Sequence, residues 1–432
     1  MKTRSMFKRV VVIAFIVIVL IGIAVWMWLP GYKELSYPSA GISNNAEHIV
    51  RGKYIAQAGN CFGCHTTRGG APFAGGRELR TVYGTFIAPN ITPDAKTGLG
   101  QWSADDFWRA LHYGKSRDGS LLYPAFPYPN YTKISRADAD ALFAYLKTIP
   151  AVEQPNKVHD LKFPYNQRYL LRVWQGLYFE PGVFKVDARQ SEVWNRGAYL
   201  VEGLGHCGAC HTTRNLLGGP DSGLFLAGAL IPTEDWYAPS LTSRQEAALA
   251  QKDTKEIVSL LRAGVSSHHA VFGPMADVVY DSLQHLAEPD VHAMAVYLQS
   301  LPQQDKDHSP KRAFSKEDEK SIMDLGRSIY EDKCVECHSA DGKGFPPRYP
   351  PLVGNRSLLA KEPVNVIRIV LNGGFPPGTA SNPQPFGMPP YGPSLSDKEI
   401  AAVVSYIRGS WGNEGSIVIP SEVNRYRSMP ID

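Results

Sequence analysis

The sequence predicts an all-α protein in which three tandem helical domains follow an N-terminal membrane-spanning helix. Three observations predict this arrangement: the pattern Cys-x-x-Cys-His occurs three times, similar helical segments surround each copy, and a long apolar run stands near the N-terminus. With 432 residues the chain is long enough for two to four domains. Its 44% hydrophobic and 20% charged content is that of an ordinary folded protein.

The apolar run extends from Val10 to Leu29, and Pro30 follows it. About 20 apolar residues can cross the hydrocarbon core of a bilayer. Trp26 and Trp28 resemble an interfacial aromatic belt, and a small-residue cleavage site is missing. We therefore expect residues 1–30 to be a retained anchor and 31–44 a linker, with a cleaved signal peptide as the alternative. Four basic residues precede the run (Lys2, Arg4, Lys8, Arg9), so the positive-inside rule places the remaining chain on the periplasmic side of a bacterial inner membrane.

Cys-x-x-Cys-His is the attachment pattern of c-type haem. Its two thiols each form a thioether with the porphyrin, and the histidine binds the iron. All six cysteines lie in the three copies, and a histidine follows every pair, which disfavours a zinc site or a redox dithiol. The sequence thus predicts three covalently attached haem c, held by Cys61, Cys64 and His65, by Cys207, Cys210 and His211, and by Cys334, Cys337 and His338.

Each copy lies within a repeated unit. A first helix carries an Arg-Gly or Gly-Arg pair, a second amphipathic helix ends near a glycine, and a third begins with acidic residues and ends in an aromatic-aliphatic pattern (Asp138–Leu146, Asp290–Leu298, Asp397–Ile407). The expected domains are 45–150, 191–302 and 319–412. Residues 151–190 and 303–318 connect them, and the polar tail 413–432 is expected to follow the surface. Apolar residues 169–179 are expected to pack between domains rather than on a partner.

Methionine is a common second ligand of haem iron, and the chain has only eight. Met275 and Met388 occupy matching loops between the second and third helices, so we predict that they bind the second and third irons. Met294 and Met323 stand at helical positions and are expected in the core. The carbonyls of Pro89, Pro239 and Pro351 are the expected acceptors for the ring N–H groups of the three iron-binding histidines.

The first domain has no such methionine, because none occurs between Met27 and Met275. Phe126 occupies the matching position and cannot bind iron. His112, at the end of the second helix, is the predicted ligand. His159 or another histidine such as His48, or an open coordination position, are the alternatives.

Several function classes are disfavoured. The net charge is only +4 and no basic run interrupts the body of the chain, which disfavours a nucleic acid partner. The glycine pairs 69–70 and 218–219 lack a helix-opening phosphate pattern, and we find no nucleophile–base constellation. Catalysis on an organic substrate is therefore expected in another chain.

Segments 122–129, 205–212 and 273–279 carry a family resemblance. Over residues 45–412 the chain resembles the triheme cytochrome c subunits of membrane-bound periplasmic dehydrogenases that oxidise alcohols, aldehydes, gluconate, sorbitol or fructose. The resemblance implies class I cytochrome c-like domains and a large catalytic subunit, with or without a small one, whose electrons pass to membrane ubiquinone. Members of the alcohol dehydrogenase type have methionine where this chain has Phe126. That departure and the uncleaved anchor favour an aldehyde-oxidising complex.

Two other functions stay open at this point. One is a cytochrome that donates directly to a terminal oxidase without a dehydrogenase partner. The other is a haem enzyme of the peroxidase kind, which would use an open position on the first iron.

Overall fold

The computed structural model describes residues 11–13, 16, 17, 20, 22, 37–39, 41, 45–231, 235–303, 314–346 and 348–427. These residues are mostly helical, as predicted, with two small antiparallel sheets. Most of the predicted anchor, Val10–Leu29, lies outside the described residues. Within the described ranges, none of the helices combines the length and the apolarity that a membrane span requires.

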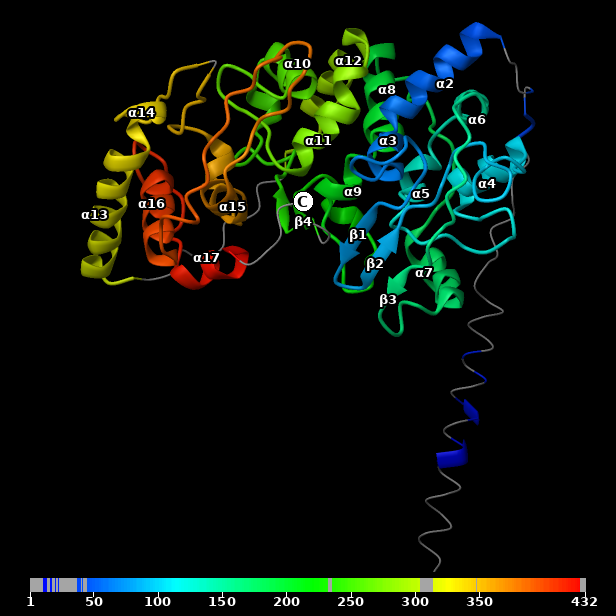
Figure 1. Cartoon of the computed structure of the whole chain (residues 1–432), viewed down its shortest axis with the longest axis horizontal. Coiled ribbons are helices and arrows are strands. Elements are labelled where there is room, and N and C mark those ends of the chain that lie inside the picture. Colours follow the sequence, from blue (N-terminus) through cyan, green and yellow to red (C-terminus); the bar gives the residue numbers. More distant parts are fainter. Residues whose placement is uncertain are drawn as a thin grey trace, which may run out of the picture.

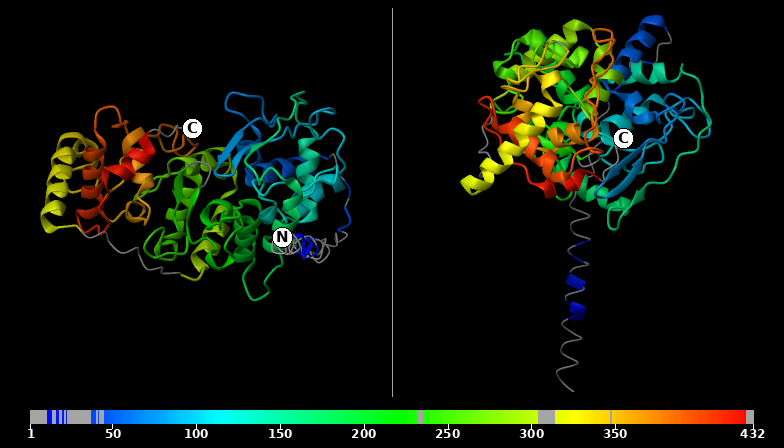
Figure 2. Two further views of the ribbon diagram at one scale, coloured as in Figure 1. Left: turned by 90° about the horizontal axis from the view of Figure 1, so that it is seen from below. Right: turned by 60° about the vertical axis from the view of Figure 1, so that its left-hand side comes forward.

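Three helical units lie in a row, with the second unit in the middle (Figures 1 and 2). The first contains α2 (Ala46–Ala58), α3 (Cys61–His65), α4 (Ala104–Tyr113), α5 (Tyr128–Tyr131) and α6 (Arg136–Leu146). The second contains α8 (Glu192–Ala198), its continuation η2 (Tyr199–Leu204), α9 (Gly208–His211), α10 (Thr254–Ala263), α11 (Pro274–Asp281) and α12 (Glu288–Ser300). The third contains α13 (Lys316–Lys333), α14 (Val335–His338), α15 (Val364–Asn372), α16 (Asp397–Gly409) and α17 (Pro420–Arg427).

Local sequence sets where these helices start and stop. A serine hydroxyl accepts a hydrogen bond from the third backbone N–H of its helix at the starts of α4, α6, α8, α13 and α16 (Ser103, Ser135, Ser191, Ser315, Ser396). Gly114 and Gly264 end α4 and α10 in the left-handed conformation, at φ 59° and 74°.

In each unit, a glycine in the first helix lets that helix cross a later helix of the same unit at close range. A Cβ on Gly52, Gly197 or Gly326 would lie 2.0, 2.0 or 2.2 Å from the carbonyl oxygen of Ala141, Ala293 or Ala402, respectively. No side chain fits in that space. The Arg-Gly and Gly-Arg pairs of the sequence therefore mark the three helix crossings α2–α6, α8–α12 and α13–α16.

The first two units exchange polar contacts reciprocally. Arg51 binds Asp138 within the first unit, and Tyr199 of the second unit donates to the same carboxylate at 2.5 Å. Arg196 binds Asp290 within the second unit, and Tyr54 of the first donates to that carboxylate at 2.6 Å. One hydrophobic core runs through both units, whereas the third unit has its own. The first two units thus pack as a pseudo-symmetric pair.

The third unit docks on the second through α15 and the loop after it. The Asn365 amide accepts from the Tyr237 N–H at 2.9 Å and donates to the Tyr237 carbonyl at 2.7 Å, as a neighbouring strand would. The Thr379 hydroxyl donates to the Ala263 carbonyl at the end of α10.

Two parts of the chain differ from the sequence expectation. Residues after Trp411 do not only follow the surface, because α17 packs on the third core through buried Val423 and Tyr426, and Arg427 binds Asp397. Short strands also occur, which an all-α prediction omits: β1 (Glu78–Thr81), β2 (Gly84–Ile87) and β3 (Asp160–Leu161) form one sheet, and β4 (Ala229–Ile231) and β5 (Trp236–Ala238) another.

The first connector forms α7 (Leu171–Tyr178), which lies below the first unit in Figure 1. Leu171, Trp174 and Phe179 are buried, as the expectation of packing between domains requires. The Trp174 indole N–H donates to the Leu217 carbonyl of the second unit at 3.0 Å. Several other apolar side chains of this segment are exposed, which that expectation does not explain.

Candidate haem-binding sites

Each Cys-x-x-Cys-His motif forms a short helix directly after the first helix of its unit, as α3, α9 and the region of α14. His65 Nδ1 lies 2.8 Å from the Pro89 carbonyl oxygen, and His211 Nδ1 lies 2.8 Å from that of Pro239. An N–H at Nδ1 leaves Nε2 as the nitrogen that can bind a metal. In the third unit His338 Nδ1 is buried and has no hydrogen-bond partner in the described structure, and the backbone oxygen that acts on its pKa is that of Pro350 rather than that of the predicted Pro351.

Burial sets the protonation of these groups. It lowers the pKa of His65, His211 and His338, so their imidazoles are neutral at pH 7, as metal ligands must be. Burial also raises the pKa of the Cys61 and Cys207 thiols to about 12. Within the described part of the chain no group of three or more His, Cys, Asp or Glu side chains is placed to hold a metal ion.

One cavity of about 450 Å³ connects the second and third units. The predicted haem-binding residues of both units line it: Cys207, Cys210, His211, Met275, Cys334, Cys337, His338 and Met388. Most of the other lining side chains are apolar. Met294 is buried in the hydrophobic core, as expected, and it also lines the cavity.

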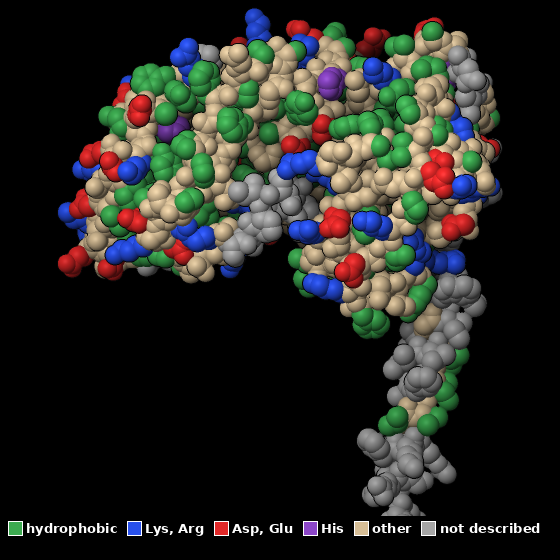
Figure 3. Space-filling model, in the orientation of Figure 1, with side chains coloured by type: hydrophobic (Ala, Val, Ile, Leu, Met, Phe, Trp, Pro, Cys, Tyr) green, Lys and Arg blue, Asp and Glu red, His purple; other side chains and the backbone are tan. Residues whose placement is uncertain are grey.

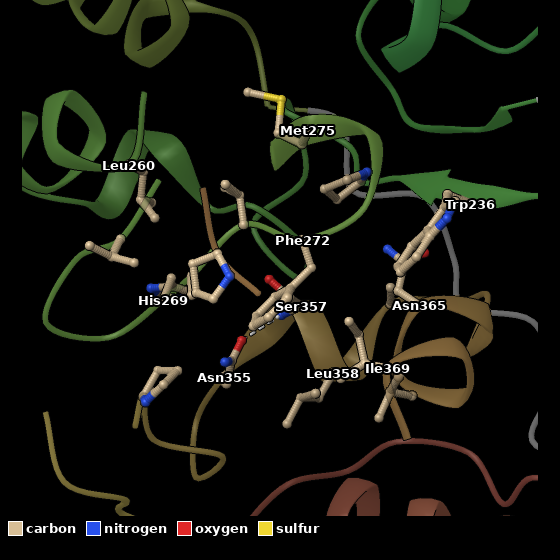
Figure 4. A pocket seen from close by; sticks show the side chains of 18 of the residues that line it. Trp236, Leu260, His269, Phe272, Met275, Asn355, Ser357, Leu358, Asn365 and Ile369 are labelled. Atoms are coloured by element: carbon tan, nitrogen blue, oxygen red, sulfur yellow. Dashed lines mark hydrogen bonds between the residues drawn. The ribbon is translucent and has the colours of Figure 1, made fainter. Parts of the chain in front are cut away.

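The two units contribute facing walls to this cavity. Figure 4 shows Met275 above, with Leu358, Ile369 and Asn365 of the third unit below and Phe272 between them. The Arg368 guanidinium lies over the Trp236 ring, 5.0 Å from its centroid. This shared space was not predicted from the sequence, because the docking of α15 on β5 brings its lining together.

The loops that carry Phe126 and Met275 begin with the same backbone hydrogen bond in the first and second units. The Leu122 N–H donates to the Gly114 carbonyl, and the Val271 N–H donates to that of Gly264, at 2.7 and 2.8 Å. Phe126 and Met275 each stand four residues after these bonds. This geometry supports the assignment of Phe126 as the counterpart of Met275.

His112 is completely buried on α4. Its ring stacks on Trp108 with a centroid distance of 4.3 Å, Nδ1 lies 3.2 Å from the Thr132 hydroxyl, and Nε2 has no hydrogen-bond partner in the described structure. Burial lowers the pKa of His112 to about 4, so the ring is neutral. The corresponding residue of the second unit, Arg262, does not line the cavity there, so this comparison does not favour His112 as a ligand.

The alternative histidines lie elsewhere in the first unit. His159 Nδ1 accepts a hydrogen bond from the Ile87 N–H at 3.1 Å, and its ring packs against Phe86 and Tyr123. His48 is on the first turn of α2, where its Nε2 is buried.

His206 joins the first two motifs, and sequence reasoning missed it. It stands directly before Cys207, and its ring packs edge-on against Tyr131 at 5.5 Å. The Tyr131 hydroxyl donates to the Gly59 carbonyl at 2.7 Å, two residues before Cys61. In the sequence, His206 is distinguished only by its position directly before Cys207, and that position does not reveal a contact with another unit.

The residues present fit a covalently bound haem. Neutral histidines with fixed rings, paired cysteines one turn away and, in two units, a methionine around a largely apolar cavity are the donor set that a c-type haem requires.

Comparisons with known proteins agree with this chemistry. A model of the cytochrome c family matches residues 49–150 and 323–411. The gluconate 2-dehydrogenase cytochrome c subunit of Pantoea cypripedii is 39% identical over 87% of this chain and 88% of its own length. The cytochrome c subunit of the quinone alcohol dehydrogenase of Gluconacetobacter polyoxogenes is 36% identical over 88% and 84%, and the fructose dehydrogenase cytochrome subunit of Gluconobacter japonicus is 33% identical over 88% and 82%.

These similarities cover 87–88% of the chain rather than single motifs. The chain therefore belongs to the family of cytochrome c subunits of gluconate, alcohol and fructose dehydrogenases, whose defining cofactor is covalently bound haem c.

Proposed function

We propose that this chain is the electron-transfer subunit of a membrane-bound dehydrogenase. It accepts electrons from a catalytic subunit that oxidises an alcohol, aldehyde or sugar-type substrate, and it delivers them to ubiquinone on the periplasmic side of the inner membrane. The observation that carries the proposal is the cavity shared by two complete sets of haem-binding side chains, in a chain of this family.

The three units are three class I cytochrome c-like domains, and each holds one haem through the cysteines and histidine of its motif. Bound haem supplies one-electron transfer between the ferric and ferrous states. The protein fixes the rings of His65 and His211, excludes water with apolar side chains, and provides Met275 and Met388 as sulfur ligands. His112 is the proposed nitrogen ligand in the first domain.

The shared cavity indicates which haem-binding sites lie next to each other within the chain. Because His211, Met275, His338 and Met388 line one space, no complete protein wall separates the second and third centres. The first and second motifs communicate through His206, Tyr131 and the Gly59 carbonyl. The cavity and the contacts of His206 both involve the second unit, so we expect electrons to pass through it.

The partner subunit is a separate chain. The names of the relatives include gluconate, alcohol and fructose dehydrogenases. The aldehyde-oxidising complex that Phe126 favours stays a prediction, and ubiquinone is the proposed acceptor.

Purification from detergent-solubilised membranes tests this function. The chain should co-purify with a large subunit, and the substrate of that subunit should reduce haem c under anaerobic conditions. A soluble ubiquinone analogue should then reoxidise it. Reduction by substrate without reoxidation by quinone would leave a terminal oxidase as acceptor, and rapid turnover of peroxide by the chain alone would favour the peroxidase alternative.

A further inference from the structure

The exposed side of helix α7 is largely apolar, and Arg172 is the one charged residue of the helix. Leu171 and Trp174 point inward and are buried, while Val173 and Leu177 lie on the outer face together with Tyr169 and Leu170 just before and at the start of the helix. Tyr169 is 72% exposed and Leu177 is 59% exposed. A surface helix normally turns polar residues outward. The outer face of α7 therefore lacks the composition of a water-exposed helix.

Neighbouring segments extend this apolar area. The β1–β2 hairpin lies next to it, because Leu171 of α7 packs in one cluster with Leu79 of β1 and Phe86 of β2. The second unit adjoins it through the bond from Trp174 to the Leu217 carbonyl, and Leu216 beside it is 91% exposed. We call the exposed side chains of this area the α7 surface: Val82, Phe163, Tyr169, Leu170, Val173, Leu177, Leu216 and Leu217.

Basic side chains lie among these apolar ones. Lys162 and Arg168 are exposed, and each donates to a backbone carbonyl, of Val82 and Leu121 respectively. In the space-filling view, hydrophobic side chains are visible at the lower edge of the molecule with Lys and Arg side chains near them (Figure 3). Aromatic and aliphatic groups bordered by Lys and Arg are typical of segments that lie in the interface of an anionic bilayer.

The chain also holds this surface near the predicted membrane anchor. Tyr37 is fixed on the first unit: Arg136 donates to its carbonyl, and its ring packs on Trp108 and His112. The His112 ring contacts Tyr113, whose carbonyl accepts from Gln175 of α7. Between Leu29 and Tyr37 the chain can extend by at most about 30 Å. The tether therefore keeps the first unit, and α7 with it, close to the bilayer.

We propose that the α7 surface lies in the headgroup region of the membrane and orients the first two units on it. The proposal rests on the anchor of the proposed function. A large subunit is the other possible occupant, but a protein interface would not need to be next to the tether, and the basic border matches anionic phospholipid.

Site-directed spin labelling of the full-length protein tests the proposal. All native cysteines are used by haem attachment, so a new cysteine is the single reactive thiol. Leu177→Cys reports on the α7 surface, and Val50→Cys on the exposed side of α2 is the matched control. Both labelled holoproteins are placed in nanodiscs of phosphatidylcholine and phosphatidylglycerol.

The label at Leu177 should be several-fold less accessible to a water-soluble nickel chelate, and more accessible to oxygen, than the label at Val50. Equal accessibility at the two sites would overturn the proposal. So would a Leu177 label that becomes protected only when the catalytic subunit is added, because the α7 surface would then be a subunit interface. If alkaline carbonate releases the wild-type protein from membranes while the label at Leu177 stays protected from the nickel chelate, the membrane anchor is refuted and the contact of the α7 surface with the bilayer is supported.

Discussion

At the residue scale, the identity of the sulfur ligand in the second unit can be tested directly, because Met275 and Met294 line the same cavity. We expect Met275→Leu to lower the midpoint potential of one haem by on the order of 100 mV, since axial ligands set potentials over a range of roughly 0.8 V. Met294→Leu is the matched control, because it removes a sulfur from the same cavity and preserves volume. Redox titration measures both, and a shift in the control alone would exchange the two roles.

The nitrogen ligand of the first centre is a second residue-scale prediction. If His112 binds iron, His112→Ala should convert one low-spin electron paramagnetic resonance signal to a high-spin one, because the iron loses a strong-field ligand. His159→Ala should leave the spectrum unchanged. An unaltered low-spin spectrum in the His112 variant, with haem content preserved, would refute the assignment and agree with the position of Arg262 outside the second cavity.

Residue-level prediction from sequence worked where the chemistry is local. Cysteine and histidine spacing identifies the attachment sites, and the contacts of His65 and His211 with the carbonyls of Pro89 and Pro239 follow it. In the third unit the backbone oxygen that acts on the pKa of His338 belongs to Pro350, one residue before the predicted Pro351. His206 could not be found at all, since its partner Tyr131 comes from another unit.

At the element scale, the three glycine crossings give a stability prediction. Gly197→Ala should destabilise the protein by about 3 kcal/mol, the upper range for overpacking, because the added Cβ meets the Ala293 carbonyl rather than a movable side chain. Gly182→Ala is the control, because a Cβ there has open space. Thermal unfolding of the holoproteins compares them, and equal midpoints would contradict the close crossing.

The reciprocal contacts between the first two units predict a pH dependence. Burial raises the pKa of Asp290, but hydrogen bonds from Arg196 and Tyr54 outweigh it and lower the pKa overall. The resulting stability is fully present above the unfolded value near 3.9 and is lost as the pH falls through the folded pKa. We expect Asp290→Asn to weaken the pair at pH 7 and to unfold with a shallower acid dependence than wild type. Circular dichroism from pH 7 to pH 2 measures this, with Asp324→Asn on the exposed face of α13 as control.

The three main helices of each unit were predictable, because apolar periodicity and, in most of them, a capping serine, asparagine or aspartate are visible in the sequence. The strands were not, since each has only two to four residues. The shared core of the first two units also escaped prediction, because Tyr54 and Tyr199 read as members of their own helices rather than as links to Asp290 and Asp138.

At the scale of the whole molecule, three complete motifs predict three covalent haems per chain. A pyridine haemochrome assay on mature protein, after extraction with acidified solvent, should return a ratio of three. Replacing His211 and its two neighbouring cysteines with alanine should lower the ratio by at least one. A ratio of two in fully matured wild-type protein would contradict the scheme of three domains.

The cavity between the second and third units has a consequence for biogenesis. A chain that has received only one of these two haems would retain an apolar hollow open to water, and the contacts of Asn365 and Thr379 would have to hold it closed without filling. We therefore expect attachment at Cys207 and at Cys334 to depend on the docking of the last unit, and a half-loaded chain to be cleaved by protease faster than the fully loaded protein.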